Sequence, residues 1–458
     1  MRSLRSVLLI FAVLAALAPA SALLAQTAAP APLRQLPAPP AAASGAAGSI
    51  DVDAATRAYI DLLPADKKAK SDAYFEGGYW LQLWGFLYGA AIYLVLLQTG
   101  ASAKMRDRAK AAFQWPPLQS AAYAVQFIVI LTLLSLPLDL YQGYFREHQY
   151  GMSNLTLGGW FGEQGKGLAI GLILGSLAIV GLYAIVRRLP RSWWVWGAIG
   201  TLAFSAFIAL IAPVAIVPMF NSPKRLGDQR VVQPILSLAR ANGIDAKEVW
   251  EIDASKQTKR VSANVSGLGS TMRITLNDNL LNRSSLPEIE AVMGHEMGHY
   301  VLNHVYKGLM EIGIIIVLGF TLINLLFERL RVRYEAKWKV TGIGDIAGLP
   351  LVGLLFSVYL FAMTPVLNTI IRTQEYEADV FGLNAARQPD GFAQAALMLS
   401  EYRKMEPGPW EEINFYDHPS GRTRIQTAMR WKAENPSTWS PALPGPAVPP
   451  PPVVPPAK

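Results

Sequence analysis

Six long apolar segments divide this chain of 458 residues, and they constrain its fold more than any other feature. Each is near or above the roughly 20 apolar residues that a helix needs to cross the hydrocarbon core of a bilayer. Charged residues make up only 16% of the chain, against roughly 25% in soluble domains. The sequence therefore predicts an all-α-dominated polytopic membrane protein with six to seven membrane helices. The six segments are 79–98, 118–138, 167–186, 193–220, 309–327 and 346–371.

The first 25 residues decide whether there is a seventh membrane helix. Arg2 and Arg5 precede a short apolar stretch at 7–18, and small residues follow it. This pattern is typical of a secretory signal peptide in residues 1–25, with an uncleaved first membrane helix as the alternative. Both ends of the chain carry biased sequence: an Ala/Pro-rich linker and amphipathic lead-in is predicted for 26–75, and a disordered proline-rich tail for 436–458.

Between the apolar segments, the sequence predicts a folded polar module in two parts. Membrane helices occupy 76–220 and 309–371, and the polar parts are 221–308 and 372–435. The first part contains alternating patterns that predict one strand and one β-hairpin, followed by a helix. The predicted strand is Lys247–Ile252, and the hairpin pairs Val261–Ser266 with Met272–Leu276 around Gly267–Leu268–Gly269.

The helix of this module carries the sequence HEMGH. Ser285 suits the helix cap and Glu288 stands three residues later, which predicts a capping box and a helix that runs through Tyr300. Positions four apart share one helix face, so His295 and His299 can bind the same metal ion. Glu296, beside the first histidine, can then take a proton from water at that metal. The alternative is a polar helix turn that binds no metal.

A catalytic zinc ion needs three protein ligands and an open position for water. The chain has no cysteine, and HEMGH is not followed by the third histidine of the metzincin pattern. We therefore expect a carboxylate from another helix, with one Zn²⁺ per chain. Glu375 is the candidate third ligand, and Asp379, four residues later, can accept a hydrogen bond from a ligand imidazole. A solvated charged face is the other interpretation of this segment.

The remaining histidines outside HEMGH carry weaker signals. His418, in an Asp-His-Pro sequence, is a candidate donor to the oxyanion that forms during peptide hydrolysis, although a histidine before proline is commonly a surface turn residue. Arg424 could pair with a carboxylate or with the substrate. His304 lies five residues after His299 and so turns away from the ligand face, which predicts a structural role. His148 is interpreted as a solvated loop residue.

In combination, these motifs resemble the CAAX prenyl protease 1 family of integral-membrane zinc metallopeptidases. The resemblance rests on HEMGH, the EYEAD segment at 375–379, the DHP segment at 417–419, the loop at 146–154, and PVAIVPMFN at 213–221. It implies helices that surround a large chamber with zinc inside, and an edge strand near Ala263–Asn264 that holds the substrate backbone. The roles it implies are zinc ligation by His295, His299 and Glu375, general base catalysis by Glu296, and transition-state stabilisation by His418.

The resulting hypothesis is a membrane-embedded zinc metalloendopeptidase with a zincin-like module, acting on peptide or membrane-protein substrates in a lipid bilayer. Two alternatives remain: a heat-shock-type quality-control metallopeptidase with the same chemistry, and a non-catalytic membrane scaffold or transporter. Nucleic acid is excluded as a partner, because the net charge of +8 comes without a basic stripe interleaved with aromatic residues. The oligomeric state is not determined by the sequence.

Loop charges predict the orientation in the membrane. Twelve basic residues lie in three loops, 101–116, 187–191 and 328–345, whereas loop 142–166 has only Arg146 and Lys166. Short loops rich in Lys and Arg stay in the cytoplasm, which places HEMGH on the opposite side. The signal-like start suggests a bacterial inner membrane with a periplasmic active site. The family resemblance implies the reverse orientation, with the zinc site open to the cytosol.

Overall fold

The computed structural model describes residues 33–44, 50–267 and 272–435. The predicted signal peptide and proline-rich tail, and the tip of the predicted hairpin turn at 268–269, lie outside the described residues. From Leu33 onward, the described residues belong to one unit.

Six long helices confirm the six predicted apolar segments, and each is long and apolar enough to cross a membrane. They are α3 (Ala65–Gln98), α5 (Pro116–Leu140), α7 (Leu157–Arg188), α8 (Trp193–Ile211), α13 (His304–Arg333) and α15 (Leu349–Ala386). Two of them continue through a wider π-helical turn into a short α-helix: α5 through η2 (Tyr141–Arg146) into α6 (Glu147–Tyr150), and α8 through η3 (Ala212–Ile216) into α9 (Val217–Phe220). The η3 turn contains Pro213, which cannot donate the regular helical hydrogen bond.

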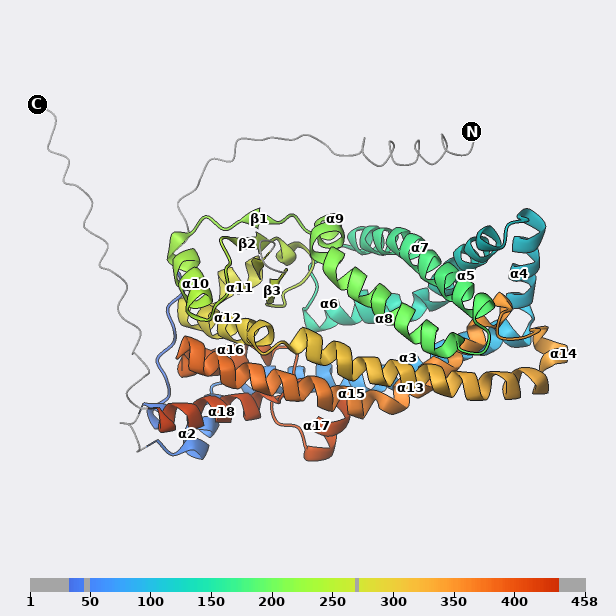
Figure 1. The fold of residues 1–458 in the computed structure, drawn as a ribbon. Coiled ribbons are helices and arrows are strands. Elements are labelled where there is room, and N and C mark those ends of the chain that lie inside the picture. Colours follow the sequence, from blue (N-terminus) through green and yellow to red (C-terminus); the bar gives the residue numbers. More distant parts are fainter. Residues whose placement is uncertain (1–32, 45–49, 268–271, 436–458) are drawn as a thin grey trace, which may run out of the picture. The chain divides into compact units, whose positions relative to one another are not determined.

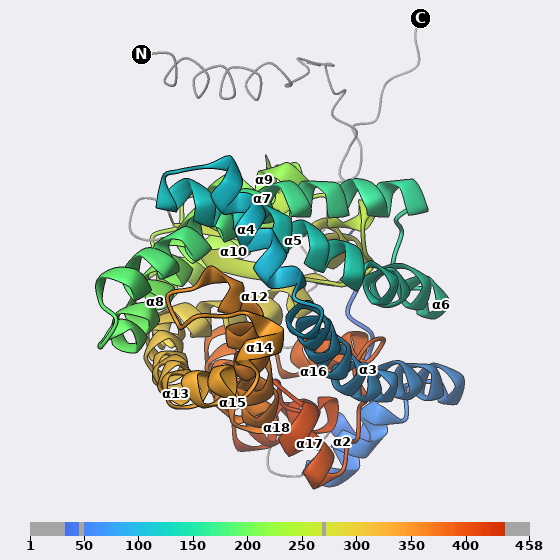
Figure 2. The ribbon, with the colours of Figure 1, turned by 90° about the vertical axis from the view of Figure 1, so that its right-hand side faces the viewer.

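The long helices contact one another in a closed order. Going round, α3 contacts α5, α5 contacts α7, α7 contacts α8, α8 contacts α13, α13 contacts α15, and α15 returns to α3. Figure 2 shows α5 and α7 on one side of this ring, with α13 and α15 on the opposite side. Neighbours along the chain are therefore neighbours in space, and the ring closes between the first and the last helix.

The three basic loops meet at one end of the ring. Loop 101–116 contains α4 (Ala101–Ala112), and loop 328–345 contains α14 (Glu335–Trp338). The short helix η6 (Ile346–Gly348) directly follows loop 328–345. Arg106 places a guanidinium nitrogen 2.5 Å from Asp345 Oδ2, and Arg187 donates to the Gly344 carbonyl at 3.2 Å. These contacts tie loop 328–345 to both of the other basic loops. In Figure 1 this end, with α4 and α14, lies opposite the end with the β-sheet.

At the other end, a four-stranded sheet has the order β1-β2-β4-β3. Its strands are β1 (Lys224–Arg225), β2 (Val249–Ile252), β3 (Ala263–Ser266) and β4 (Arg273–Asn277). β2 and β4 are parallel, and the outer pairs are antiparallel. The predicted strand and hairpin are thus confirmed. Ile274 and Leu276 are fully buried and point into a core shared with α10 (Gln229–Ala241) and α12 (Leu286–Val301).

The second polar part packs against the same helix α12 from its other side. A core cluster joins Tyr59, Ala291, Leu383, Phe392 and Met429, which come from five different helices. The lead-in before the first long helix takes part through α2, which the sequence analysis had grouped with the linker. The remaining short elements are η1 (Ala41–Ala43), α2 (Val52–Ile60), η4 (Ala254–Lys256), α11 (Asp278–Arg283), α16 (Pro389–Leu399), α17 (Pro409–Phe415) and α18 (Gly421–Glu434).

Candidate metal centre and active site

Helix α12 begins with the capping box that the sequence predicts. The backbone N–H of Ser285 donates to the Glu288 carboxylate at 2.6 Å, so one of the unpaired donors at the helix start is satisfied. Met293 and Met297 are fully buried against the sheet. With that face packed in the core, the face that carries His295 and His299 is directed toward α15, which packs against α12.

Small residues allow α12 and α15 to approach closely. A Cβ atom added to Gly294 would lie 2.9 Å from the Gly382 carbonyl oxygen, and one added to Gly382 would lie 2.7 Å from the backbone nitrogen of His295. At Gly298 the nearest atom would be the Cα of Ala378, at 3.1 Å. Side chains larger than hydrogen would separate the helices, so these glycines bring Glu375 within reach of the histidines.

His295, His299 and Glu375 are brought together as the sequence predicts, with donor atoms within 4.8 Å of one another. The two Nε2 atoms lie 3.2 Å apart. The Glu375 oxygens lie 3.3 Å from His295 Nε2 and 3.3 Å from His299 Nε2. Two ligands at about 2.0–2.1 Å from a tetrahedral zinc ion stand about 3.3–3.4 Å apart. The spacing of the three donor atoms therefore fits three ligands of one zinc ion.

Carboxylate and guanidinium groups surround this donor set. Asp379 is buried, and its Oδ1 lies 2.8 Å from His295 Nδ1, on the side of the ring away from the other donors. Arg424 on α18 places Nε 3.0 Å from Asp379 and Nη2 3.1 Å from Glu375. The contact with Asp379 favours the tautomer of His295 that presents a bare Nε2 to a metal. The positive charge of Arg424 offsets the two buried carboxylates.

The structure gives His299 a neighbour that the sequence analysis did not expect. His304 Nδ1 lies 3.0 Å from His299 Nδ1, and His304 Nε2 lies 3.0 Å from Glu377 Oε2. Lys307 completes the chain with contacts of 3.0 and 2.9 Å to Glu377. The prediction that His304 turns away assumed one continuous helix. Asn303 has a left-handed backbone (φ 58°) that ends α12 and starts α13, and this turn brings His304 back to His299.

Glu296 lies in a cavity of about 250 Å³ beside the donor set. Burial raises the pKa of its carboxyl group above the ordinary value. A carboxylate with a raised pKa is a stronger proton acceptor, which suits a general base. The cavity is also lined by Ala263, His418 and Arg424. The structure thus places the predicted base, the predicted oxyanion donor and one edge-strand residue around the same space.

His418 reaches the site from the loop before α18. Its Nε2 lies 3.1 Å from Glu375 Oε2, and its Nδ1 lies 2.7 Å from Asp417 Oδ1. Burial lowers the pKa of His418, so the neutral ring is favoured. Arg372 lies on the same helix as Glu375. It holds this loop in place, because it donates a hydrogen bond of 2.6 Å to the Tyr416 carbonyl. The alternative interpretation of this segment, a solvated charged face, does not fit this contact of Arg372.

The edge strand β3 borders the active-site cavity, whereas His148 does not line it. β3 pairs with β4 along one edge, and no other described strand covers its second edge. Ala263 faces the cavity, whereas Asn264, one residue later, is exposed. The free backbone edge can pair with an extended peptide. His148 contacts the Tyr144 carbonyl at 2.8 Å and does not line the cavity.

Comparisons with known proteins cover most of the chain. Residues 225–432 match the model of peptidase family M48, and residues 53–222 match the model described as CAAX prenyl protease N-terminal, five membrane helices. An uncharacterized metalloprotease, YhfN of Bacillus subtilis, is 34% identical over 74% of this chain and 80% of its own length. CAAX prenyl protease 1 of Saccharomyces cerevisiae is 27% identical over 69% of this chain and 73% of its own length.

A solved structure shares the fold. The crystal structure of Ste24p from S. mikatae aligns with a TM-score of 0.68 at 23% identity, and it covers 80% of this chain and 90% of that chain. Together with HEMGH and its third carboxylate, these similarities confirm the family, the fold and the type of reaction that the sequence predicts. The chain belongs to peptidase family M48, and it is a membrane zinc metalloprotease related to CAAX prenyl protease 1.

Proposed function

We propose that the chain is an endopeptidase that binds one Zn²⁺ through His295, His299 and Glu375. The observation that supports this most directly is the spacing of their donor atoms, 3.2–3.3 Å, which matches the edges of a zinc tetrahedron. A zinc ion held by these residues would act as a Lewis acid, which would polarise the scissile carbonyl and make water easier to deprotonate. The buried contact between Asp379 and His295 supports a fixed ligand geometry.

The other site residues transfer the proton, stabilise the oxyanion and bind the substrate backbone. Glu296 takes a proton from the attacking water and passes it to the leaving amine, so that the carboxylate is regenerated. His418 donates a hydrogen bond to the oxyanion that develops on the carbonyl. The free edge of β3 at Ala263 and Asn264 pairs with the substrate backbone and holds it in extended form beside the cavity. Arg424 forms ion pairs with Glu375 and Asp379 and holds both carboxylates in position.

Replacing Glu296 by glutamine tests this assignment. Glu296→Gln retains the size of the side chain and all three donors, so zinc content stays at the wild-type level while peptide cleavage falls by roughly 100-fold or more. Metal content and cleavage of a quenched fluorescent peptide are measured on the same purified sample. Glu290→Gln is the matched control, because Glu290 lies on the same helix and contacts Gln388 instead of the cavity. Substantial cleavage by Glu296→Gln would exclude it as the base.

The substrates are proposed to be peptides or membrane-protein segments that enter from the bilayer. The match of residues 53–222 to the five-membrane-helix model supports a prenyl-protease type of architecture over a smaller quality-control peptidase. A heat-shock-type substrate range is the second candidate, since the same donors would serve it. A proteome-wide comparison of membranes that carry the wild type or Glu296→Gln would identify the substrates that accumulate.

We also propose an orientation in the bacterial inner membrane with the active site toward the periplasm. Contacts between the three basic loops support it, because they gather twelve Lys and Arg residues at the end of the ring opposite the sheet. The positive-inside rule assigns that end to the cytoplasm. The prenyl-protease resemblance carries the opposite expectation.

A further inference from the structure

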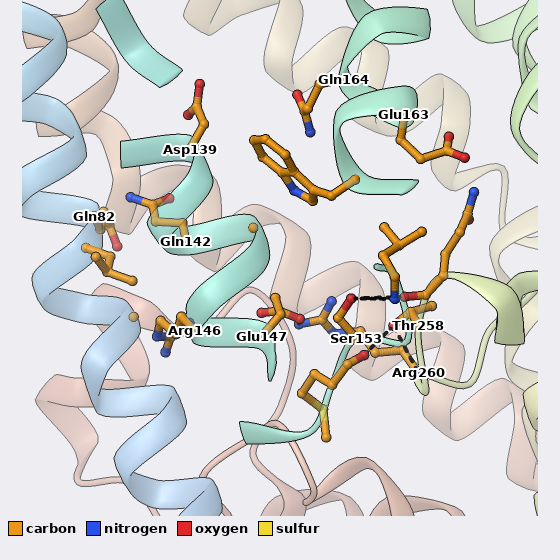
Figure 3. A pocket seen from close by; sticks show the side chains of 17 residues that line it. Gln82, Asp139, Gln142, Arg146, Glu147, Ser153, Glu163, Gln164, Thr258 and Arg260 are labelled. Atoms are coloured by element: carbon orange, nitrogen blue, oxygen red, sulfur yellow. Dashed lines mark hydrogen bonds and ion pairs between the residues drawn. The ribbon is translucent and has the colours of Figure 1, made fainter. Parts of the chain in front are cut away.

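A second and larger cavity, of about 870 Å³, lies beside the active site. Figure 3 shows its walls: side chains from α3, from the η2 turn, from α7 and from the loop before β3 converge on it. None of the residues assigned to metal binding or catalysis lines this space. No step of the proposed reaction uses a residue that lines this cavity.

Polar side chains form about half of the walls of the larger cavity, beside apolar ones such as Leu81, Leu155 and Trp160, although three membrane-spanning helices build it. Gln82 of α3, Gln142 of η2 and Gln164 of α7 line it, and none of their amides makes a hydrogen bond to another described residue. Asp139 and Glu163 add carboxylates, and one Glu163 oxygen is buried without a partner. Side-chain amides without partners in a cavity are free to bind a ligand that offers both donors and acceptors.

A buried guanidinium adds to this polarity. Arg146 is 9% exposed, lies over the Tyr74 ring at 4.1 Å and donates to the Tyr74 carbonyl. No described carboxylate forms an ion pair with it. An alkyl or prenyl chain in this space would strip water from Arg146 and from the glutamine amides without replacing their hydrogen bonds, which is unfavourable. A polar polypeptide segment would replace them.

The two cavities share one stretch of chain. Gln257, Thr258 and Arg260 line the larger cavity, and Val261 to Ala263 line the active-site cavity. Thr258 is held by a bridge to Ser153, and the Asn279 amide donates to the Thr258 and Arg260 carbonyls at 2.7 and 3.1 Å. The stretch is therefore fixed, and it runs from one cavity into the strand that borders the other.

Arg260 stands at the boundary between the two spaces. Its guanidinium lies 2.9 Å from Glu147, which lines the larger cavity, and 5.7 Å from the ring of Tyr402, which lines the active-site cavity. Ala263 comes three positions after Arg260, a distance of roughly 10 Å in an extended chain. A substrate that pairs with β3 and continues past the start of that strand by about three or four residues would reach the larger cavity.

We propose that this cavity is a second substrate-binding site, which takes an unlipidated, hydrophilic segment of the polypeptide a few residues from the scissile bond. The inference rests on the proposed peptidase function and adds the substrate class to it. Gln82, Gln142 and Gln164 bind the backbone and polar side chains of that segment, and Arg146 binds its carbonyl or carboxylate oxygens.

Three quenched fluorescent peptides test the proposal with the full-length, zinc-loaded protein. The first is a short core peptide. The other two carry four-residue extensions at both ends, either of Ser, Thr, Asn and Gln or of Leu and Val. The readout is the ratio of kcat/KM for each extended peptide to that for the core. We expect the hydrophilic extension to give the higher ratio, and Gln142→Leu/Gln164→Leu to lower it by roughly two- to tenfold per lost hydrogen bond.

Two further variants show whether the effect belongs to the amides. Gln142→Asn/Gln164→Asn keeps the hydrogen-bonding groups and should retain most of the ratio. Gln119→Leu, whose residue lines a separate cavity at the basic end, should leave the ratio unchanged. An unchanged ratio in the double leucine variant, or a higher ratio for the apolar extension, overturns the inference while the peptidase function stands. Failure of the zinc-loaded wild type to cleave any of the peptides overturns the proposed function and the inference together.

Discussion

Glu375 and Asp379 lie four residues apart on α15, yet their carboxylates contact different histidine nitrogens. Glu375 offers both oxygens to the space between the histidines, at 3.3 Å from each Nε2. Asp379 instead reaches the far nitrogen of His295 at 2.8 Å. A ligand contributes its bond to the metal directly, whereas a carboxylate behind a ligand acts through the orientation and basicity of the imidazole.

We therefore expect the two alanine variants to differ. Glu375→Ala should lose zinc from the purified protein, because two imidazoles alone make an incomplete site. Asp379→Ala should keep the metal with roughly 10–100-fold weaker affinity or activity. Competition with a chromophoric chelator measures the affinity of both variants. Full zinc occupancy in Glu375→Ala would show that the third ligand is another residue.

His304 extends the same logic to the second histidine. In the proposed site Nε2 of His299 would bind the metal, so its Nδ1 would carry the proton and donate to His304 Nδ1, which lies 3.0 Å away. His304 then has its own proton on Nε2, which faces Glu377 at 3.0 Å. The side chain of His304 is 3% exposed, so little water competes for these contacts. Each ligand imidazole thus has a partner that fixes its tautomer.

Removing the second partner should weaken zinc binding. His304→Phe keeps an aromatic ring but removes both nitrogens, and we expect zinc affinity to fall by roughly 10–100-fold. His304→Gln retains hydrogen-bonding groups and should lose less. His148→Phe is the matched control, because that exposed histidine lies outside the cavity. The result to look for is a change in zinc dissociation constant, and equal affinities for His304→Phe and the control would rule out the positioning role.

At the scale of elements, the crossing of α12 and α15 determines whether the metal centre can form. The two helices carry the three proposed zinc ligands and the proposed base, so their separation sets the distances from Glu375 to His295 and His299. Backbone atoms touch where Gly294 meets Gly382 and where Gly298 meets Ala378. Well-packed interiors accept an added methylene only with a backbone shift or a strained side chain.

An added methyl group at this crossing should therefore damage the site. In Gly382→Ala the new Cβ would stand 2.7 Å from the His295 nitrogen, so the helices must separate at a cost of about 1–3 kcal/mol. We expect a lower melting temperature and reduced zinc content. Gly181→Ala on α7, where a Cβ meets no atom within 4 Å, should be neutral or slightly stabilising. Unaltered zinc content in Gly382→Ala would show that the crossing is more tolerant than its contacts indicate.

At the scale of the whole molecule, charge and chemistry lie at opposite ends of the helix ring. Arg106 and Arg187 join the basic loops at one end, and the sheet with its cavities lies at the other (Figure 1). A membrane protein with this arrangement has its orientation set by the basic end. In the orientation that we propose, the basic end lies in the cytoplasm and the active site opens to the periplasm.

Reporter fusions measure that direction. Alkaline phosphatase, which folds into an active enzyme only after export, should be active when fused after Lys458 and inactive when inserted near Thr341. A cytoplasmic reporter at the same two positions should give the reverse pattern and controls for expression. If instead the insertion near Thr341 is the active one, the site opens to the cytosol and the loop charges do not set the orientation.

The sequence by itself determined the six long helices, the strand and hairpin, and the zinc peptidase chemistry. Helices that cross a bilayer need about 20 apolar residues in a row, which is a local property that any window of the chain displays. The HEMGH pattern is equally local, because both imidazoles are placed by the pitch of one helix. Glu375, on a later helix, could be predicted as the third ligand from its spacing of four residues to Asp379, because the pitch of a helix places both on one face.

Only the tertiary structure decided which distant residues meet. The prediction that His304 faces away from His299 was wrong, because its direction depends on one left-handed residue, Asn303, at the junction of two helices. The contacts of Arg372 and Glu377 could not be predicted, because nothing near them in the sequence shows that a loop carbonyl and a histidine lie beside them. The larger cavity likewise exists only where three helices and one loop converge. Contacts of this kind depend on the closure of the whole helix ring. The local sequence around each residue does not indicate which distant residues it will contact.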